Sequence, residues 1–412
     1  MKVKLSPRWL EGSLSAVQSK SHLHRLLIAN ALSGSNQHIK LGQISEDIAA
    51  TIECLKELVS VEAPDLYCNE SGSTLRFLLP ITMALKDEAA FHGKGRLPER
   101  PLGPLKDVLV EGGCVFLNGT DSMFAVKGKL KSGRYYLPGN VSSQYITGLL
   151  FALPLVKGES KVVVSKPLES VGYINMTLQV LDLYGIRIFI DRISDEDNVI
   201  FTIPGGQEYK APIETPVVEG DWSNSAFWLA AGAISRQGEG IDVYGLSHSS
   251  AQGDKEIIDL LKSFGAKILF SDDHAFVSKG NLCGITIDAS NIPDLVPILA
   301  VLASVSQGIT RIIKADRVRI KESDRLHAIS VSLNAIGGIV TELEDGLIIN
   351  GVDSLTGGFV PSFNDHRIVM AMTIASCCCE SEIIIDGAEA INKSYPTFFD
   401  DFTILGGKHS YL

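Results

Sequence analysis

One pattern recurs along the chain and limits the folds that it can adopt. A short polar cluster opens an apolar run rich in Ala, Leu and Ser, and a β-branched segment follows a few polar residues later. Self-similarity of this kind indicates one supersecondary unit that is repeated. The pattern occurs six times, and its copies begin near Lys20, Gly72, Ser143, Ser223, Asp294 and Asp365.

A second, amphipathic segment lies between the copies and ends at a glycine. Segments 181–185, 261–265 and 333–337 have this form, and segment 105–113 resembles them. Glycine is the usual residue at the left-handed position after a helix. We therefore expect a repeated unit of helix, strand, helix and strand, whose strands include 161–164, 241–244, 310–313 and 383–385.

The first helix of each unit indicates the fold class. Its residues are apolar on all sides, which is typical of a buried helix, so the sheets must lie outside it. With 412 residues, of which 45% are hydrophobic, the chain is too long for one ordinary core. We predict an α/β protein made of two inside-out barrels, each with buried helices and outer sheets.

The domain boundaries follow from the repeat and from a segment rich in Pro and Gly at 211–221. We expect a discontinuous first lobe of residues 1–14 and 218–412, and a second lobe of residues 15–217. The chain would then cross twice between the lobes, with a two-strand hinge near 11–18 and 215–221. Such a hinge lets two domains close over a ligand.

Composition excludes several classes of protein. The formal net charge of −11 argues against a nucleic-acid surface, because phosphate backbones are bound by basic patches. The first residues lack the apolar core of a signal peptide, and no run reaches the roughly 20 apolar residues of a membrane span. We therefore expect a cytoplasmic protein. The seven cysteines have no metal-ligand spacing, and His22 and His24 do not share a helical face, so we expect no metal.

Polar and basic residues gather where the apolar helices begin. Backbone N–H groups and the helix dipole make a helix N-terminus attractive to anions. Ser223 and Asn224 are explained equally well as simple N-caps. Capping does not explain Lys20, Arg25, Arg76 and Arg367, whose positive charge opposes the dipole. These side chains indicate a site for a negatively charged ligand.

Two dense charge clusters point the same way. Segment 317–326 reads RVRIKESDRL, and the cluster 365–367 directly precedes an apolar run. The first cluster could also be a solvated helix face, because such runs usually lie at the surface. A cation at the edge of a core is costly unless an anion meets it, which favours a ligand site.

Together these positions resemble the 5-enolpyruvylshikimate-3-phosphate synthase family over the whole chain. The carrying motifs are QSKS with Arg25, ESGSTLR at 70–76, RLPERP at 96–101, VSSQ at 141–144, VEGD at 218–221, IPD at 292–294, KESDRL at 321–326, NDHR at 364–367, and Lys393 in NKSYP. The resemblance implies the enolpyruvyl transferase fold, with three βαβαββ repeats in each domain. It also implies transfer of the enolpyruvyl group of phosphoenolpyruvate to the 5-hydroxyl of shikimate 3-phosphate, with release of phosphate. The implied partners are these two substrates, in a monomer without metal or organic cofactor.

The resemblance also assigns roles to residues. Those implied to bind phosphoenolpyruvate are Lys20, Gly72, Arg100, Gln144, Arg325, Arg367 and Lys393. Those implied to bind shikimate 3-phosphate are Lys20, Ser21, Arg25, Ser142, Ser143, Gln144, Ser170, Asp294 and Lys321. Asp294 would accept the hydroxyl proton, Glu322 and Lys20 would transfer protons at the methylene carbon, and His366 would assist.

Three positions depart from the commonest pattern of this family, namely Glu70, Ser73 and Arg317. Glu70 and Arg317 change the local charge, so sensitivity to the phosphonate inhibitor glyphosate does not carry over. We expect Gly72→Ala to weaken that inhibitor and phosphoenolpyruvate alike. Two alternatives stay open: UDP-N-acetylglucosamine enolpyruvyl transferase, and a non-catalytic anion-binding relative. The first usually has a Cys where Gly95 stands, and the second predicts loss of acidic groups such as Asp294 and Glu322.

Overall fold

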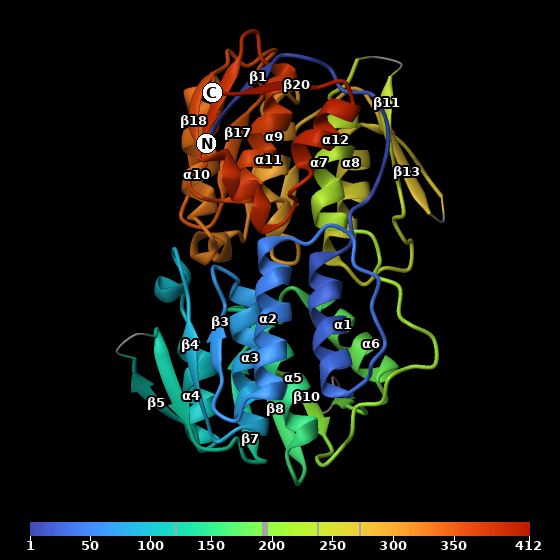
Figure 1. Ribbon diagram of the computed structural model, residues 1–412. Coiled ribbons are helices and arrows are strands. Elements are labelled where there is room, and N and C mark those ends of the chain that lie inside the picture. Colours follow the sequence, from blue (N-terminus) through green and yellow to red (C-terminus); the bar gives the residue numbers. More distant parts are fainter. Residues whose placement is uncertain (120–121, 192–196, 237–238, 272) are drawn as a thin grey trace. The chain divides into compact units, whose positions relative to one another are not determined.

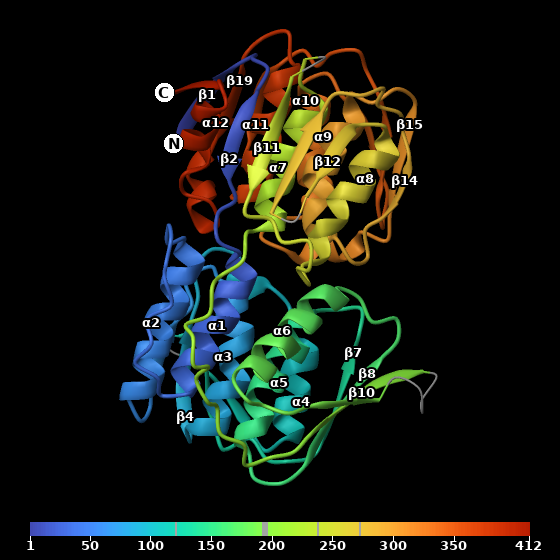
Figure 2. The same cartoon turned by 90° about the vertical axis from the view of Figure 1, so that its right-hand side faces the viewer.

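A computed structural model describes residues 1–119, 122–191, 197–236, 239–271 and 273–412. The chain forms two compact units (Figures 1 and 2), which we call the first unit, Met1–Ser19 with Glu219–Leu412, and the second unit, Lys20–Val218. The sequence had placed residues 15–19 in the second lobe. Here Ala16 N donates to Tyr244 O at 2.8 Å and Ser19 N donates to Glu219 O at 2.8 Å, so these residues belong to the first unit. The hinge itself stays a prediction.

The first unit contains three four-stranded sheets. One has the order β14-β15-β17-β16, another β12-β13-β11-β2 and the third β18-β19-β1-β20. The strands are β1 (Lys2–Ser6), β2 (Gly12–Ser15), β11 (Gly240–Tyr244), β12 (Lys267–Phe270), β13 (His274–Ser278), β14 (Thr286–Asp288), β15 (Ile309–Ile313), β16 (Ile339–Glu342), β17 (Leu347–Asn350), β18 (Gly358–Pro361), β19 (Ile383–Asp386) and β20 (Lys408–Tyr411). The N-terminal strands complete two of the sheets, because β2 pairs with β11 in parallel and β1 pairs with β19 antiparallel.

Two helices accompany each sheet of the first unit. The inner ones are α7 (Trp222–Ala233), α9 (Val296–Ser304) and α11 (His366–Ala375), and all their residues are buried. The others are α8 (Ile257–Phe264), α10 (Arg325–Ala335) and α12 (Phe398–Ile404). Elements β14, α9, β15, α10, β16 and β17 follow one another as a complete βαβαββ repeat. Helices inside and sheets outside confirm the predicted fold class (Figure 2).

The second unit contains two such repeats with sheets. Their sheets have the orders β3-β4-β6-β5 and β7-β8-β10-β9. The strands are β3 (Asp65–Tyr67), β4 (Glu88–His92), β5 (Val115–Asn118), β6 (Phe124–Lys127), β7 (Arg134–Pro138), β8 (Ser160–Ser165), β9 (Phe189–Asp191) and β10 (Asn198–Ile203). The helices are α3 (Gly72–Leu85), α4 (Gly103–Glu111), α5 (Ser143–Ala152) and α6 (Val171–Leu183). A Cβ atom at Gly148 would lie 2.4 Å from Arg76 O, so only glycine lets α5 pack this closely on α3.

The remaining repeat of the second unit is incomplete in the described residues. It has the helices α1 (Lys20–Leu32) and α2 (Glu46–Ser60), and no four-stranded sheet of the described part accompanies them. An irregular segment runs beside them instead, where Gln37 Nε2 donates to Pro212 O at 2.8 Å. The predicted repeat is therefore present six times as helices and five times as sheets among the residues described.

Most predicted helix starts are confirmed, because α1, α3 and α5 begin at Lys20, Gly72 and Ser143. Asp294 differs: it lies in a 3₁₀ turn, η4 (Pro293–Leu295), and α9 begins two residues later. Pro293 and Pro297 fit this turn and the first helical turn, where a missing N–H costs nothing. In the part of the chain that the structure describes, no helix is long and apolar enough to cross a membrane.

Candidate functional site

Capping side chains fix the ends of the helices on which the candidate residues lie. Asp221 accepts a hydrogen bond from Asn224 N at 2.8 Å, and Asp365 accepts one from Arg367 N at 2.9 Å. Ser71 caps α3 in the same way, by accepting from Thr74 N at 3.2 Å. Caps satisfy backbone donors that the helix leaves without a partner, so they set where each helix begins.

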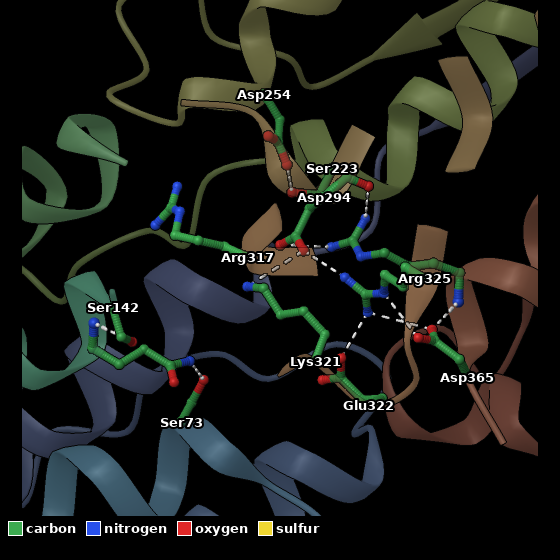
Figure 3. Close-up of polar contacts among 12 residues, drawn as sticks. Ser73, Ser142, Ser223, Asp254, Asp294, Arg317, Lys321, Glu322, Arg325 and Asp365 are labelled. Carbon is green, nitrogen blue, oxygen red and sulfur yellow. Dashed lines mark hydrogen bonds and ion pairs between the residues drawn. The ribbon is translucent and has the colours of Figure 1, made fainter. Parts of the chain in front are cut away.

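In the first unit, Arg325 contacts Glu322 and Asp365 from the two charged segments, and also Asp294 (Figure 3). Its Nε atom lies 2.8 Å from Asp365 Oδ2, and its Nη1 atom lies 2.7 Å from Asp294 Oδ1. Nη2 donates to Glu322 Oε2 at 2.7 Å. The Arg325 side chain is 1% exposed. We call Asp294, Lys321, Glu322, Arg325, Asp365 and Arg367 the charge cluster. The solvated-face interpretation of segment 317–326 is therefore wrong for Arg325.

Asp294 is the most surrounded carboxylate of the charge cluster. Besides Arg325, it contacts Arg367 Nη2 at 3.2 Å and Lys321 Nζ at 3.8 Å. Burial alone would raise the pKa of Asp294, but Arg367, Lys321 and Arg325 outweigh burial and hold the pKa well below its usual range. Asp294 is thus a carboxylate that stays ionised as long as these cations face it.

The pKa values of three other residues of the charge cluster are shifted for similar reasons. Burial raises and Arg325 lowers the pKa of Asp365, and the net direction is downward. Burial lowers the pKa of Arg325, yet Asp365, Glu322 and Asp294 reverse this and raise it. For Lys321 burial prevails, so its pKa falls below the ordinary lysine value although Asp294 opposes the change. The Lys321 side chain, 28% exposed, is the most accessible cation of the cluster.

Three further candidates lie near this cluster in the first unit. His366 is buried, and its Nδ1 atom lies 3.9 Å from Asp365 Oδ1. Lys393 lies in a 3₁₀ segment, η7 (Ala388–Lys393), and donates to Asn364 O at 2.7 Å. Arg317 is 8% exposed and donates to Ser290 O. The contacts of His366 and Lys393 place these two basic groups where α11 begins.

In the second unit, the first residue of α1 carries an ion pair. Lys20 Nζ lies 2.8 Å from Asp47 Oδ2, and the two side chains are 16% and 12% exposed. Asp47 belongs to the first turn of α2, where its charge is also favourable to the helix dipole. The pair fixes the Lys20 ammonium group beside the start of α1.

Gly72 is flanked by two guanidinium groups. A Cβ atom placed on Gly72 would lie 2.5 Å from Arg76 Nη1 and 2.8 Å from Arg100 Nη1. Arg76 also donates to Gln144 Oε1 at 3.0 Å and to Pro101 O at 3.2 Å. The start of α3 therefore combines a helix N-terminus with two cations, which is an arrangement that suits a phosphate or carboxylate.

Gln144 joins this group to the start of α5. Its Nε2 atom donates to Ser73 Oγ at 2.9 Å, and its backbone N–H donates to Ser142 Oγ at 3.3 Å (Figure 3). Ser143, the first residue of α5, is buried. The hydroxyl of Ser73 therefore lies next to the side-chain amide of Gln144, and the hydroxyl of Ser142 lies next to its backbone N–H.

Arg25 and Ser170 lie deeper in the second unit. Arg25 is 2% exposed, and its guanidinium donates to Thr177 Oγ1 at 2.8 Å and to Ser21 O at 2.6 Å. These bonds tie Arg25 to the backbone of Ser21. Burial lowers the pKa of Arg25 to about 10. Ser170 precedes α6 with φ of 54°, a left-handed conformation that a non-glycine residue seldom adopts.

Each unit by itself thus brings some of the predicted residues into contact, such as Arg325 with Asp294 and Glu322 in the first unit, and Gln144 with Ser142 in the second. The ligand-binding and catalytic roles of the predicted residues stay predictions. Three acidic residues that contact other groups in the first or second unit were absent from the predicted site. They are Asp47, which pairs with Lys20, Asp254, which accepts a hydrogen bond from Ser223, and Asp365, which pairs with Arg325. Asp365 was visible as part of a charge cluster, and a role as counter-ion could have been inferred from it. Among the described residues, no group of three or more His, Cys, Asp or Glu side chains could hold a metal ion.

The fold of this chain is similar to that of two solved enolpyruvyl transferases. The solved EPSP synthase from Acinetobacter baumannii matches with a TM-score of 0.78 and 23% identity over 100% of both chains. The enolpyruvyl transferase NikO from Streptomyces tendae matches with a TM-score of 0.77 and 14% identity over 99% of this chain and 98% of its own. The fold is therefore that of the enolpyruvyl transferases.

Sequence relatives show which family of enolpyruvyl transferases the chain resembles. The profile described as EPSP synthase (3-phosphoshikimate 1-carboxyvinyltransferase) matches residues 59–402. The 3-phosphoshikimate 1-carboxyvinyltransferase of Clostridium kluyveri is 43% identical over 98% of this chain and 97% of its own length. That of Clostridioides difficile is 39% identical over 98% of each. The chain belongs to the EPSP synthase family.

Proposed function

We propose that this protein is a 3-phosphoshikimate 1-carboxyvinyltransferase. It transfers the enolpyruvyl group of phosphoenolpyruvate to the 5-hydroxyl of shikimate 3-phosphate and releases phosphate. The observation that carries this proposal is the relationship of 43% identity over nearly the whole of both chains. The cationic groups at the helix starts of each unit support it, because both substrates are multiply anionic and repel each other unless their charge is neutralised.

We assign the binding of phosphoenolpyruvate to the residues that the family resemblance implies, most of which carry a guanidinium or ammonium group. The residues are Lys20, Gly72, Arg100, Gln144, Arg325, Arg367 and Lys393. Two of them support the assignment most directly. Gly72 leaves room between two guanidiniums, and Arg367 contacts Asp294 while only 6% exposed. A planar guanidinium matches phosphate and carboxylate oxygens bidentately.

Shikimate 3-phosphate is assigned to Lys20, Ser21, Arg25, Ser142, Ser143, Gln144, Ser170, Asp294 and Lys321. Most of these carry hydroxyl, amide or ammonium groups, which suit a polyhydroxylated ring with one phosphate. Arg25 has a supporting role, because its bonds to Thr177 and to Ser21 O already occupy much of its guanidinium. We infer that it fixes the start of α1.

The chemistry needs a base and an acid. Asp294 accepts the proton of the attacking hydroxyl, while Glu322 and Lys20 deliver a proton to the methylene carbon and His366 assists. The hydroxyl oxygen then bonds to the adjacent carbon, and the tetrahedral adduct loses phosphate and the added proton. Asp294 is a weak base while three cations hold its charge. An anionic ligand that engages Arg325 and Arg367 weakens this hold and makes Asp294 more basic.

The test is phosphate release from purified protein. Phosphoenolpyruvate is supplied with either shikimate 3-phosphate or UDP-N-acetylglucosamine. Release with shikimate 3-phosphate alone is expected. Phosphate release only with the UDP-sugar would overturn the choice of shikimate 3-phosphate as acceptor. If the protein is folded by circular dichroism and releases no phosphate with either acceptor, it is a non-catalytic relative.

We also propose that the protein acts as a cytoplasmic monomer. Its cysteines Cys54, Cys68, Cys114, Cys283, Cys377, Cys378 and Cys379 are all thiols rather than disulfides, as in a reducing compartment. Light scattering coupled to size exclusion tests the oligomeric state against the chain mass of 44.4 kDa.

A further inference from the structure

Asp254 is a buried carboxyl that the reaction above does not use. It lies in a 3₁₀ turn, η3 (Gly253–Glu256), which leads into α8, and its side chain is 0% exposed. Its Oδ2 atom accepts a hydrogen bond from the hydroxyl of Ser223, in the first turn of α7 (Figure 3). A carboxyl that is fully removed from water must either be neutral or be matched by a cation.

The groups that face Asp254 come from three other elements. Asp294 in η4 and Asp221 at the start of α7 are negative, and Arg367 in α11 is positive. On its own turn, Lys255 donates to the carbonyls of His248 at 2.8 Å and Ser250 at 3.1 Å. Arg367 contacts Asp294 at 3.2 Å, and its charge also acts on Asp254.

Geometry decides which of the two carboxyls carries a proton. Asp294 has Arg325 at 2.7 Å, Arg367 at 3.2 Å and Lys321 at 3.8 Å, so it stays ionised. Asp254 accepts a hydrogen bond from the neutral hydroxyl of Ser223, and the charge of Arg367 favours its ionised form. Accordingly, burial and then the charge of Asp294 raise the pKa of Asp254 to about 7, although Arg367 opposes them.

We propose that Asp254 is a positioning residue that works as a neutral carboxyl. In this form it orients Ser223 and leaves the charge of Arg367 to Asp294 and to an anionic ligand. Once ionised, it competes with the ligand for Arg367. The inference rests on the proposed function, in which Arg367 binds phosphoenolpyruvate.

The first test compares the wild type with Asp254→Asn, which keeps the shape but cannot ionise. From pH 6 to pH 9 the KM for phosphoenolpyruvate is expected to rise about tenfold more in the wild type than in the variant, which corresponds to one pKa unit of coupling. The ratio of the two KM values removes the titration of the substrate, which is common to both. Asp259→Asn, an exposed change on α8, is the matched control and should follow the wild type. Parallel KM profiles for wild type and Asp254→Asn would overturn the proposal.

The second test needs no substrate, so it separates this inference from the proposed function. Because the pKa is raised in the folded state, folded protein holds a proton between about pH 4 and pH 7 that unfolded protein has lost. The urea midpoint of the wild type should therefore fall relative to that of Asp254→Asn as the pH rises through this window, and the difference should be constant above it. A difference that does not change with pH would contradict a neutral Asp254.

Ser223→Ala keeps the inference testable if Asp254→Asn does not fold. Loss of the hydroxyl donor removes a bond that favours the ionised carboxyl, so the change in KM should move to higher pH. An unmoved profile in Ser223→Ala would overturn the proposal, because the titration would then not belong to the carboxyl that Ser223 contacts.

Discussion

Arg325 and Asp365 form an ion pair that is almost completely removed from water. Their Nε and Oδ2 atoms are 2.8 Å apart, and the side chains are 1% and 0% exposed. Asp365 also accepts a hydrogen bond from Ser323 Oγ at 2.9 Å and caps α11. One carboxylate thus orients the central guanidinium of the charge cluster and the start of the helix that carries Arg367.

We expect Asp365→Asn to destabilise the protein by about 3 kcal/mol, because it leaves a buried cation short of one counter-ion. Asparagine remains a good N-cap, so the loss is electrostatic. The pKa of Asp365 is depressed in the folded state, so its contribution is present at neutral pH and is lost as the pH falls below about 4. Urea unfolding at pH 7 and at a series of pH values below about 4 measures both effects.

Asp324→Asn is the matched control for this change. Asp324 caps α10 and pairs with Arg319 at 2.8 Å, but its side chain is 38% exposed. Exposed pairs contribute about 0–1 kcal/mol, so the loss should stay below about 1 kcal/mol. Equal losses in the two variants would show that burial does not govern the Arg325–Asp365 pair.

Gly72→Ala should weaken the binding of phosphoenolpyruvate and of glyphosate together. The new methyl group displaces the ends of Arg76 and Arg100, which are flexible side chains, so the fold is retained. We expect the KM for phosphoenolpyruvate and the inhibition constant of glyphosate each to rise about tenfold, or about 1.4 kcal/mol. Gly103→Ala, where no atom lies within 4 Å of the new Cβ, serves as control. Unchanged constants for both ligands would contradict the placement of Gly72.

Lys321→Arg should extend activity to higher pH. Burial lowers the pKa of the Lys321 ammonium, so it loses its proton, and its hold on an anionic ligand, at a lower pH than an ordinary lysine. A guanidinium does not titrate in this range. The alkaline limb of the kcat/KM profile for shikimate 3-phosphate should therefore move to higher pH in Lys321→Arg. Lys314 is an exposed lysine, and the alkaline limb should stay in place in Lys314→Arg. An alkaline limb common to all three proteins would exclude Lys321 as its source.

The fold was largely predictable because its signals are local. The polar caps before apolar runs at Lys20, Gly72 and Ser143 mark real helix starts, and Gly265 and Gly337 end α8 and α10 with positive φ. Among the described residues, no four-stranded sheet accompanies α1 and α2, and this was not predictable, because the six copies of the helix pattern do not reveal which strands pair. Strand pairing depends on contacts between distant segments.

The charged residues of the site were predictable, but their partners were not. Lys20 and Asp47 are separated by 27 positions, and an acidic residue in the first turn of α2 is explained by the helix dipole alone. Asp254 lies in the segment AQGDKE, whose composition is typical of an exposed turn, and yet it is fully buried. Burial of a single carboxyl is a property of the assembled unit, so no local pattern announces it.

The ion pair between Lys20 and Asp47 allows a test that separates the effect on activity from the effect on stability. Lys20→Met removes the ammonium group, and we expect kcat/KM to fall at least 100-fold, the scale of a lost proton-transfer group. It also leaves Asp47, 12% exposed, without this cation, so the urea midpoint should fall. Adding Asp47→Asn should restore the midpoint but not the activity.

Asp47→Asn alone completes this double-mutant cycle. It keeps the ammonium group but removes its orienting partner, so we expect a smaller loss of activity, about tenfold. If Asp47 acts only through Lys20, the double variant is no less active than Lys20→Met. Losses of activity that add in the double variant would mean that Asp47 has a role of its own, and that the 2.8 Å contact is not what positions Lys20.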